Sequence, residues 1–97
     1  MKSIAQIREI LKEYKEELRE KYKVKEIGIF GSYIRDEQKE KSDLDILIEI
    51  EDSISLLKFV ELENHLSDII GVKADLVMKS ALKPRIGKHI LREVITV

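Results

Sequence analysis

The sequence predicts an α/β (α+β) fold, with a small mixed β-sheet and helices packed mainly on one face. Three observations support this class: a long helical pattern at the start, short β-branched segments after it, and a second helical pattern between two of those segments. Helical and strand segments that alternate along a chain favour layers of sheet and helix. Because 97 residues with 43% apolar side chains have room for one core, we expect a single domain over residues 1–97.

The beginning of the chain predicts a helix followed by a strand. Ser3 and Gln6 have the S-x-x-Q spacing of a capping box, and apolar residues recur at helical spacing as far as about Tyr22. Residues 24–30 (VKEIGIF) are short, rich in β-branched side chains and partly alternating, which is typical of a strand. Gly31 then ends that strand.

The middle of the chain predicts a strand, a second helix and a third strand. Residues 42–50 alternate between apolar and polar side chains with a period of two, so one face of this strand packs against the core. Residues 54–70 carry an apolar stripe at helical spacing, and Gly71 suits the left-handed residue that ends a helix. Residues 73–77 predict the third strand. The helical stripe consists of Leu56, Phe59, Val60, Leu66, Ile69 and Ile70.

The C-terminal segment predicts a final helix and an edge strand. Ser80 is a candidate N-terminal cap, and Pro84 suits the first turn of a helix. Residues 94–97 are β-prone and can add a strand at the edge of the sheet, where a second copy or another protein could pair with it. The apolar side of the helix consists of Ile86, Ile90 and Leu91.

Composition narrows the classes of function. The 18 Lys and Arg residues nearly balance the 19 Asp and Glu residues, which disfavours a polybasic nucleic-acid binder. Without cysteine the chain has no disulfide, thiolate nucleophile or zinc-thiolate site. No apolar run approaches the roughly 20 residues that span a bilayer, and the N-terminus has no signal core. We therefore expect a cytoplasmic protein with no membrane contact and no direct nucleic-acid partner.

Three aspartates are candidates for metal binding and catalysis. Asp43 and Asp45 lie on the same side of their predicted strand, with Cα atoms about 6.6 Å apart at a rise of ~3.3 Å per residue. Asp75 joins them if its strand is the neighbour. Such crowding of carboxylates is costly unless cations or protons neutralise it. Hard oxygen ligands favour Mg²⁺ or Mn²⁺, so we expect these ions as cofactors.

Gly31 and Ser32 supply a complementary phosphate site. Glycine lets the backbone approach an anion closely, and a turn that begins there directs free N–H groups and the Ser32 hydroxyl at it. Arg35, one turn later, can add positive charge. A polyphosphate and two divalent ions between these residues and the aspartates would match two-metal phosphoryl or nucleotidyl transfer.

The segment GSYIRDEQKEKSDLDILIE resembles the signature of the DNA polymerase β-like nucleotidyltransferase superfamily. That signature is a Gly-Ser pair, ten residues and a D-x-D motif, which here ends in Asp43-Leu44-Asp45. The later ADLV, with Asp75, resembles the superfamily's third acidic strand. The length of the chain and its ending LKPRIGKHILREVITV resemble the minimal nucleotidyltransferase (MNT) family, the MntA-type antitoxins of HEPN/MNT toxin–antitoxin pairs.

This resemblance implies an activity and a partner. Members of the family transfer AMP from ATP, with Mg²⁺, onto a tyrosine hydroxyl of a partner HEPN ribonuclease toxin, which blocks the toxin. Carried over by position, Asp43, Asp45 and Asp75 would ligate metal. Asp75 would also help to deprotonate the acceptor.

The resemblance assigns the triphosphate to Gly31 and Ser32, near Arg35. Asp36 departs from the family pattern, which often has glycine after the arginine. An extra carboxylate at the mouth of the loop is expected to weaken triphosphate binding, whereas the metal-binding aspartates are unaffected.

Two alternatives stay open at this point. The chain could be an antitoxin that neutralises its toxin by binding alone, or a nucleotidyltransferase that acts on a small molecule such as an aminoglycoside. The small-molecule enzymes generally have an additional acceptor-binding domain, which 97 residues do not provide. Charge and spacing do not decide between a homo-oligomer and a complex with another protein.

Overall fold

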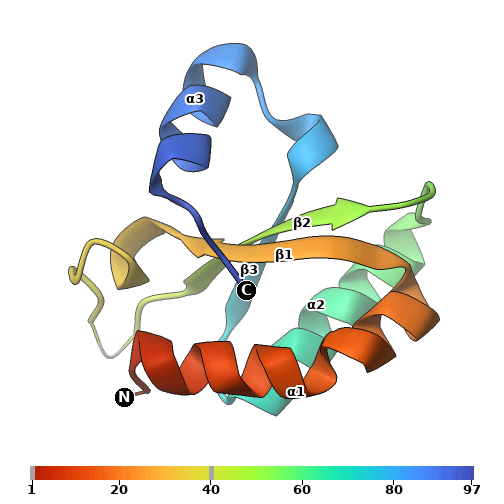
Figure 1. Cartoon of the computed structure of the whole chain (residues 1–97), viewed down its shortest axis with the longest axis horizontal. Coiled ribbons are helices and arrows are strands. Elements are labelled where there is room, and N and C mark those ends of the chain that lie inside the picture. Colours follow the sequence, from red (N-terminus) through yellow and green to blue (C-terminus); the bar gives the residue numbers. More distant parts are fainter. Residues whose placement is uncertain (1, 40) are drawn as a thin grey trace.

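The protein is a mixed sheet with helices on both sides (Figure 1). The computed structural model describes residues 2–39 and 41–97. Within these residues it has four strands, three α-helices and two short 3-10 turns, which confirms the predicted class. In chain order the elements are α1 (Ile4–Tyr22), β1 (Val24–Phe30), η1 (Gly31–Tyr33), β2 (Leu44–Ile50), α2 (Leu56–Ile70), β3 (Ala74–Met78), η2 (Lys79–Ala81), α3 (Pro84–Glu93) and β4 (Ile95–Thr96).

Helix α1 begins and ends where the sequence predicts. The Ser3 hydroxyl accepts the backbone N–H of Gln6 at 3.2 Å, and the Gln6 side chain accepts the backbone N–H of Ser3 at 2.9 Å. Both partners of the predicted capping box are therefore present. The helix ends at Lys23, which has a left-handed backbone with φ of 59°.

Helix α2 buries part of the predicted stripe, but its core-facing row includes Leu62 and leaves out Leu56 and Val60. Leu62, which that stripe omits, is fully buried together with Leu66 and Ile70 at four-residue steps. Leu56 and Val60 are instead 77% and 44% exposed. At about 100° per residue, Val60 lies ~200° around the helix axis from Leu62. The apolar residues of α2 surround more than one face, so periodicity alone misplaced the stripe.

The C-terminal helix starts later than a Ser80 cap implies. Ser80 lies in η2, and the residue that precedes the helix is Lys83, which makes no side-chain cap. Pro84 is the first helical residue, as predicted, because proline disfavours a helical conformation in the residue before it. On this short helix Ile86 and Leu91 are 59% and 49% exposed.

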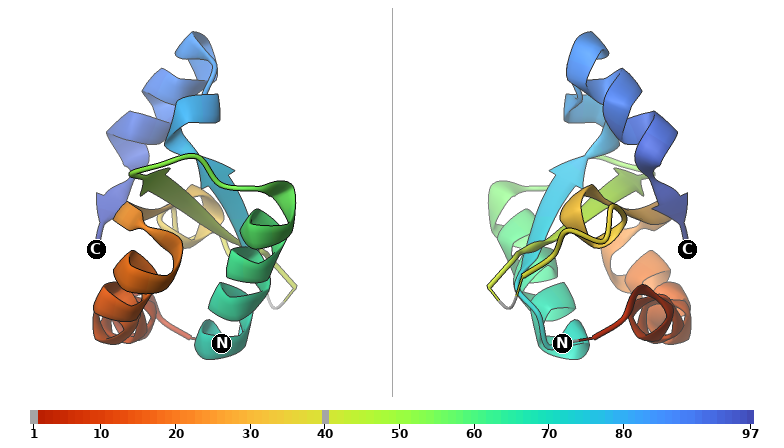
Figure 2. Two further views of the ribbon diagram at one scale, coloured as in Figure 1. Left: turned by 90° about the vertical axis from the view of Figure 1, so that its right-hand side faces the viewer. Right: turned by 90° about the vertical axis from the view of Figure 1, so that its left-hand side faces the viewer.

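The sheet has strand order β3-β2-β1-β4. β2 and β3 are parallel, whereas β1 is antiparallel to both of its neighbours, β2 and β4. Helices α1 and α2 cover one face, and α3 rises from the opposite face (Figure 2). The predicted edge strand at the C-terminus is thus confirmed. The small mixed sheet with helices mainly on one face is confirmed as well.

The two faces of the sheet have different roles. Ile27 pairs with Ile48 and Ile29 with Ile46, and all four are buried beneath α1 and α2. Side chains alternate along a strand, so the intervening residues point to the face opposite α1 and α2. That second face contains Asp45. None of the described helices is long and apolar enough to cross a membrane.

Replacing Leu62 by alanine tests the corrected phase of α2. Leu62→Ala is expected to lower the free energy of unfolding by about 2–5 kcal/mol, because it leaves a cavity in the core. The matched control Leu56→Ala changes the same side chain on the same helix at an exposed position, and should cost less than about 0.5 kcal/mol. Urea unfolding followed by circular dichroism measures both. Equal losses would show that the buried row is assigned incorrectly.

Candidate active site

Asp45 and Asp75 lie side by side on the open face of the sheet. They are directly opposite each other in the parallel pairing of β2 and β3. Asp45 is partly buried and Asp75 is exposed. Burial, which is the largest cause, acts together with the charge of Asp75 and a hydrogen bond with Asp75 to raise the pKa of Asp45 to about 6. The neighbouring strands thus hold the two acidic groups close enough for the charge of Asp75 to affect the ionisation of Asp45, as the sequence predicts for adjacent strands.

Asp43 lies near this pair. It is exposed and immediately precedes Leu44, where β2 begins two positions later than the predicted start of the strand. Its charge also helps to raise the pKa of Asp45, whereas the positive charge of Arg35 lowers it. The structure therefore brings Arg35 and all three predicted aspartates into one electrostatic neighbourhood.

The three aspartates do not form a preorganised metal site in this structure. Among residues 2–39 and 41–97, no three His, Cys, Asp or Glu side chains have the geometry to hold a metal ion. The chemistry of the donors nevertheless fits Mg²⁺, which uses few carboxylates and completes its shell with water and phosphate oxygens. Burial is the main cause of the raised pKa of Asp45, and the nearby charges of Asp75 and Asp43 add a repulsion that a divalent cation would relieve. Metal binding by Asp43, Asp45 and Asp75 stays a prediction.

Gly31 lies against the acidic pair at the start of the predicted phosphate-binding loop, residues 31–36, which is called the phosphate loop below. It follows β1 directly and has φ of 83°, in the left-handed region that favours glycine. A Cβ atom at this position would overlap the carboxylate of Asp45. Any other residue would therefore strain the backbone and displace that carboxylate. The geometry explains why a glycine is needed here, beyond its predicted contact with phosphate.

The loop after Gly31 forms one tight turn. The carbonyl of Gly31 accepts the N–H groups of Ile34 at 3.0 Å and Arg35 at 3.1 Å. Ser32, in the middle of η1, is partly exposed. Asp36 has φ of 57°, a conformation that aspartate tolerates better than most residues. This backbone gives a physical reason for glycine at the same position in the resembling family.

Glu93 also contacts this loop, although the sequence analysis did not identify it as a site residue. Its Oε2 atom accepts the backbone N–H of Gly31 at 3.2 Å, and its Oε1 atom accepts the Nη1–H of Arg35 at 2.7 Å. Glu37 also contacts Arg35, at 3.4 Å from Nε. Glu93 lies 62 positions from Gly31 along the chain, so no local spacing could have identified it.

A basic hollow adjoins Asp43. Its volume of about 590 Å³ is within the range of small-ligand sites. Three lysines and the Tyr33 ring contribute to its wall, next to the candidate metal ligand. The residues that line it are Lys2, Gln6, Tyr33, Lys41, Ser42, Asp43, Gly71, Val72 and Lys73.

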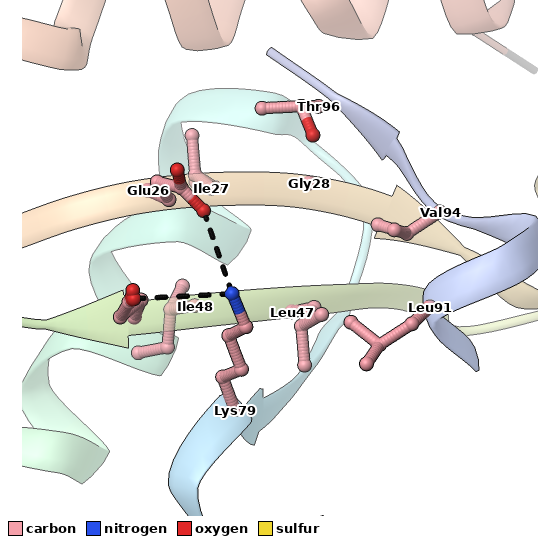
Figure 3. Close-up of a pocket in the computed structure, with 10 residues that line it drawn as sticks. Glu26, Ile27, Gly28, Leu47, Ile48, Lys79, Leu91, Val94 and Thr96 are labelled. Carbon is pink, nitrogen blue, oxygen red and sulfur yellow. Dashed lines mark ion pairs between the residues drawn. The ribbon is translucent and has the colours of Figure 1, made fainter. Parts of the chain in front are cut away.

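Farther along the same sheet face, residues of η2, α3 and β4 cover the strands. Figure 3 shows a small cavity there, of about 90 Å³, with Leu47, Leu91 and Val94 on its walls. Lys79 reaches across it to Glu26 at 3.8 Å and to Glu49 at 3.9 Å. These two glutamates are paired in register on β1 and β2. These two glutamates are thus balanced by a lysine, whereas the ion pairs among residues 2–39 and 41–97 include none between a lysine and Asp43, Asp45 or Asp75.

Comparisons with known proteins identify the family. The sequence profile of the "Nucleotidyltransferase domain" matches residues 11–97. Protein adenylyltransferase MntA of Thermococcus cleftensis is 54% identical over 97 residues, covering 100% of this chain and 98% of the relative. A solved structure assigned to the minimal nucleotidyltransferases is 32% identical with a TM-score of 0.75, covering 96% of this chain and 90% of that one.

Two solved toxin–antitoxin complexes share the fold. A chain of one, solved with AMP-PNP, has a TM-score of 0.70 at 22% identity, covering 95% of this chain and 69% of that chain. The other contains a tri-AMPylated Shewanella oneidensis HEPN toxin and an MNT antitoxin. It has a TM-score of 0.66 at 20% identity, covering 95% of this chain and 68% of that chain. At these identities the likeness concerns the fold alone.

The fold and the matched profile define the class of this protein, which is that of the nucleotidyltransferases. The chain belongs to the nucleotidyltransferase domain family, in its group of minimal, MntA-type protein adenylyltransferases.

The pKa of Asp45 predicts how the metal-free protein responds to pH. Its folded value of about 6 exceeds its ordinary value of 3.8, so the folded state holds this proton more tightly than the unfolded state. Stability is therefore lost as pH rises from about 4 to 6. Asp45→Asn should remove this loss and be more stable than the parent above pH 6, by roughly 1 kcal/mol after allowance for solvent screening.

Urea unfolding in EDTA at a series of pH values measures the difference between the two proteins. The difference should vanish below about pH 4, where both side chains are neutral. A difference that is the same at pH 3.5 and pH 7 would contradict the assigned pKa. Asp68→Asn, an exposed change on α2, serves as the control for general charge effects.

Proposed function

We propose that this protein transfers AMP from ATP to a tyrosine hydroxyl of a partner HEPN ribonuclease toxin, uses Mg²⁺, and thereby acts as the antitoxin. The observation that carries the proposal is the contact geometry of Gly31, which brings the phosphate loop against Asp45 and its neighbour Asp75. A phosphate-binding turn and an acidic pair on two strands are the halves that nucleotidyl transfer requires.

The nucleotide is proposed to bind through its phosphates. The backbone of Gly31, the Ser32 hydroxyl and the Arg35 guanidinium would hold the triphosphate. The basic hollow beside Asp43 supports this assignment, because it offers nucleotide-sized space and lysine side chains next to the aspartates. Two comparisons support ATP as the nucleotide: a structural neighbour was solved with the ATP analogue AMP-PNP, and the Thermococcus cleftensis relative is named a protein adenylyltransferase.

The metal is proposed to be held by Asp43, Asp45 and Asp75, with two Mg²⁺ ions, or Mn²⁺ in their place. When bound, the ions would neutralise charge on the reacting phosphate and on the leaving pyrophosphate. The aspartates would hold these ions opposite the phosphate loop, so that the phosphate chain lies between the loop and the ions. Their crowding in the folded protein keeps the donors ready for a cation.

Asp75 is proposed to act as the general base. It is exposed on β3, so an acceptor hydroxyl can approach it from solvent. The tyrosine oxygen attacks the α-phosphorus, the bond between that phosphorus and the bridging oxygen breaks, and pyrophosphate leaves. The hydroxyl proton passes to the Asp75 carboxylate. One O–P bond forms as another breaks, so the step needs no further reactant.

The proposed partner is a HEPN toxin, because structural neighbours of this chain were solved in complexes with toxins. The neighbours bound in toxin–antitoxin complexes include one whose HEPN toxin carries AMP groups. If residues 1–97 act as one catalytic domain, the acceptor tyrosine can come from a protein partner, which then completes the acceptor site. The proposed reaction consumes ATP and modifies a toxin inside the cell, so we propose that it takes place in the cytoplasm.

A transfer assay tests the proposed activity. The purified protein, ATP labelled at the α-phosphate, Mg²⁺ and the HEPN protein encoded beside it are incubated together, and label on the partner is measured. We expect labelled partner with the parent and with Asp68→Asn. Asp43→Asn combined with Asp45→Asn should lower the rate by about 1,000-fold or more, because the phosphate loses its metal ligands.

Folding of the double variant is verified by circular dichroism, and an established MntA and HEPN pair serves as the positive control. An unlabelled partner in the presence of the parent protein would contradict the proposal. Full neutralisation of the toxin by the folded, inactive double variant would instead favour an antitoxin that acts by binding alone.

Metal binding predicts a separate thermal effect. Addition of Mg²⁺ at pH 8 should raise the melting temperature of the parent by a few degrees, because an ion that binds only the folded state stabilises it. Asp45→Asn and Asp75→Asn should each lose most of this rise, whereas Asp68→Asn should keep it. An equal rise in all four proteins would contradict metal binding by the aspartates.

A further inference from the structure

The carboxylate of Glu93 occupies the donors of the phosphate loop. One of its oxygens accepts the Gly31 N–H and the other accepts an N–H of Arg35. A phosphate group uses the same kinds of contact: two negative oxygens, a backbone N–H and a guanidinium. Glu93 is therefore placed as an anion would be placed in this loop.

The contact is better sheltered than the other ion pair of Arg35. The Glu93 side chain is 20% exposed, whereas Glu37 is 63% exposed and lies farther from the guanidinium. Glu37 makes no contact with the Gly31 N–H among the hydrogen bonds of the described residues. Of the two glutamates, Glu93 alone bridges the backbone donor and the guanidinium.

The backbone of Glu93 is held in position by the sheet. Glu93 is the last residue of α3, and two residues later Ile95 pairs with Ile29 on β1. Val94 also packs so closely over Gly28 that a Cβ atom there would lie 2.6 Å from its Cγ2 atom. Only the side chain of Glu93 can therefore leave the loop without rearranging the sheet, and its rotamers make that movement local.

We infer that Glu93 is an internal competitor for the nucleotide's phosphates: it fills the Gly31 and Arg35 donors in the nucleotide-free protein, and a polyphosphate must displace it. This inference rests on the proposed function, and it adds a residue that sets nucleotide affinity. The contact satisfies the loop's donors when no nucleotide is bound. It also lowers affinity, because the carboxylate must give up two hydrogen bonds and then stay near the bound anion.

Direct binding measurements on the full chain test this competition. Glu93→Gln keeps the size of the side chain and removes its charge. In Mg²⁺, its dissociation constants for ATP and for inorganic tripolyphosphate should fall by about three- to tenfold relative to the parent, measured by calorimetry. Glu37→Gln removes a charge beside the same arginine without freeing the Gly31 N–H, and should change the constants by less than about twofold.

A second measurement separates competition from positioning. With Arg35→Gln in both proteins, the gain from Glu93→Gln should shrink, because one of the two contested donors is gone. Unchanged or weaker binding by Glu93→Gln would overturn the inference, since Glu93 would then support the loop. An equal gain from Glu37→Gln would also overturn it, as a general charge effect.

The outcome for the proposed function is distinct. If the parent binds ATP but Glu93→Gln brings no gain, only this inference fails. If neither protein binds ATP or tripolyphosphate in Mg²⁺, the inference and the proposed function are both overturned. Measurements without the partner protein keep the result independent of the acceptor.

Discussion

The electrostatic repulsion between Asp45 and Asp75 is the constraint on which the rest of the site depends. Parallel pairing of β2 and β3 places the two carboxyl groups directly opposite each other, and partial burial prevents water from screening them fully. The folded chain accommodates this by holding a proton on Asp45 more tightly. A charge conflict that folding does not relieve is typical of a functional site, because a ligand can relieve it. Gly31 belongs to the same constraint, since only a residue without Cβ leaves room for the Asp45 carboxylate.

The sheet separates stability from chemistry. One face is occupied by the apolar core beneath α1 and α2, where alternate residues of β1 and β2 are fully buried. The other face carries carboxylates at both ends. At one end Lys79 balances Glu26 and Glu49, beside a small cavity that Leu91 of α3 helps to line. At the other end the aspartates have no such lysine among the ion pairs of the described residues, and a basic hollow opens beside them. Negative charge without a lysine partner favours a cation at that end.

The C-terminal segment contributes more to the site than its position in the chain suggests. After α3, the short strand β4 returns to the edge of β1 and fixes the end of the helix close to the phosphate loop. Glu93 thereby reaches Gly31 and Arg35. The same arrangement leaves Ile86 and Leu91 of α3 partly exposed. The loop after β1 is thus connected to the end of α3 through a contact between segments that lie far apart in the sequence.

By itself, the sequence determined what depends on neighbouring residues. Caps such as Ser3 and Gln6, the period of the strands, and the spacing from the Gly-Ser turn to the D-x-D motif are local, so they fixed the elements, the fold class and the candidate residues. Tertiary structure decided which face of each element met another. It buried Leu62 rather than Val60, because both positions are apolar and only packing selects between them. It also brought Glu93 to the phosphate loop, since a contact across 62 positions leaves no periodic signal in the chain.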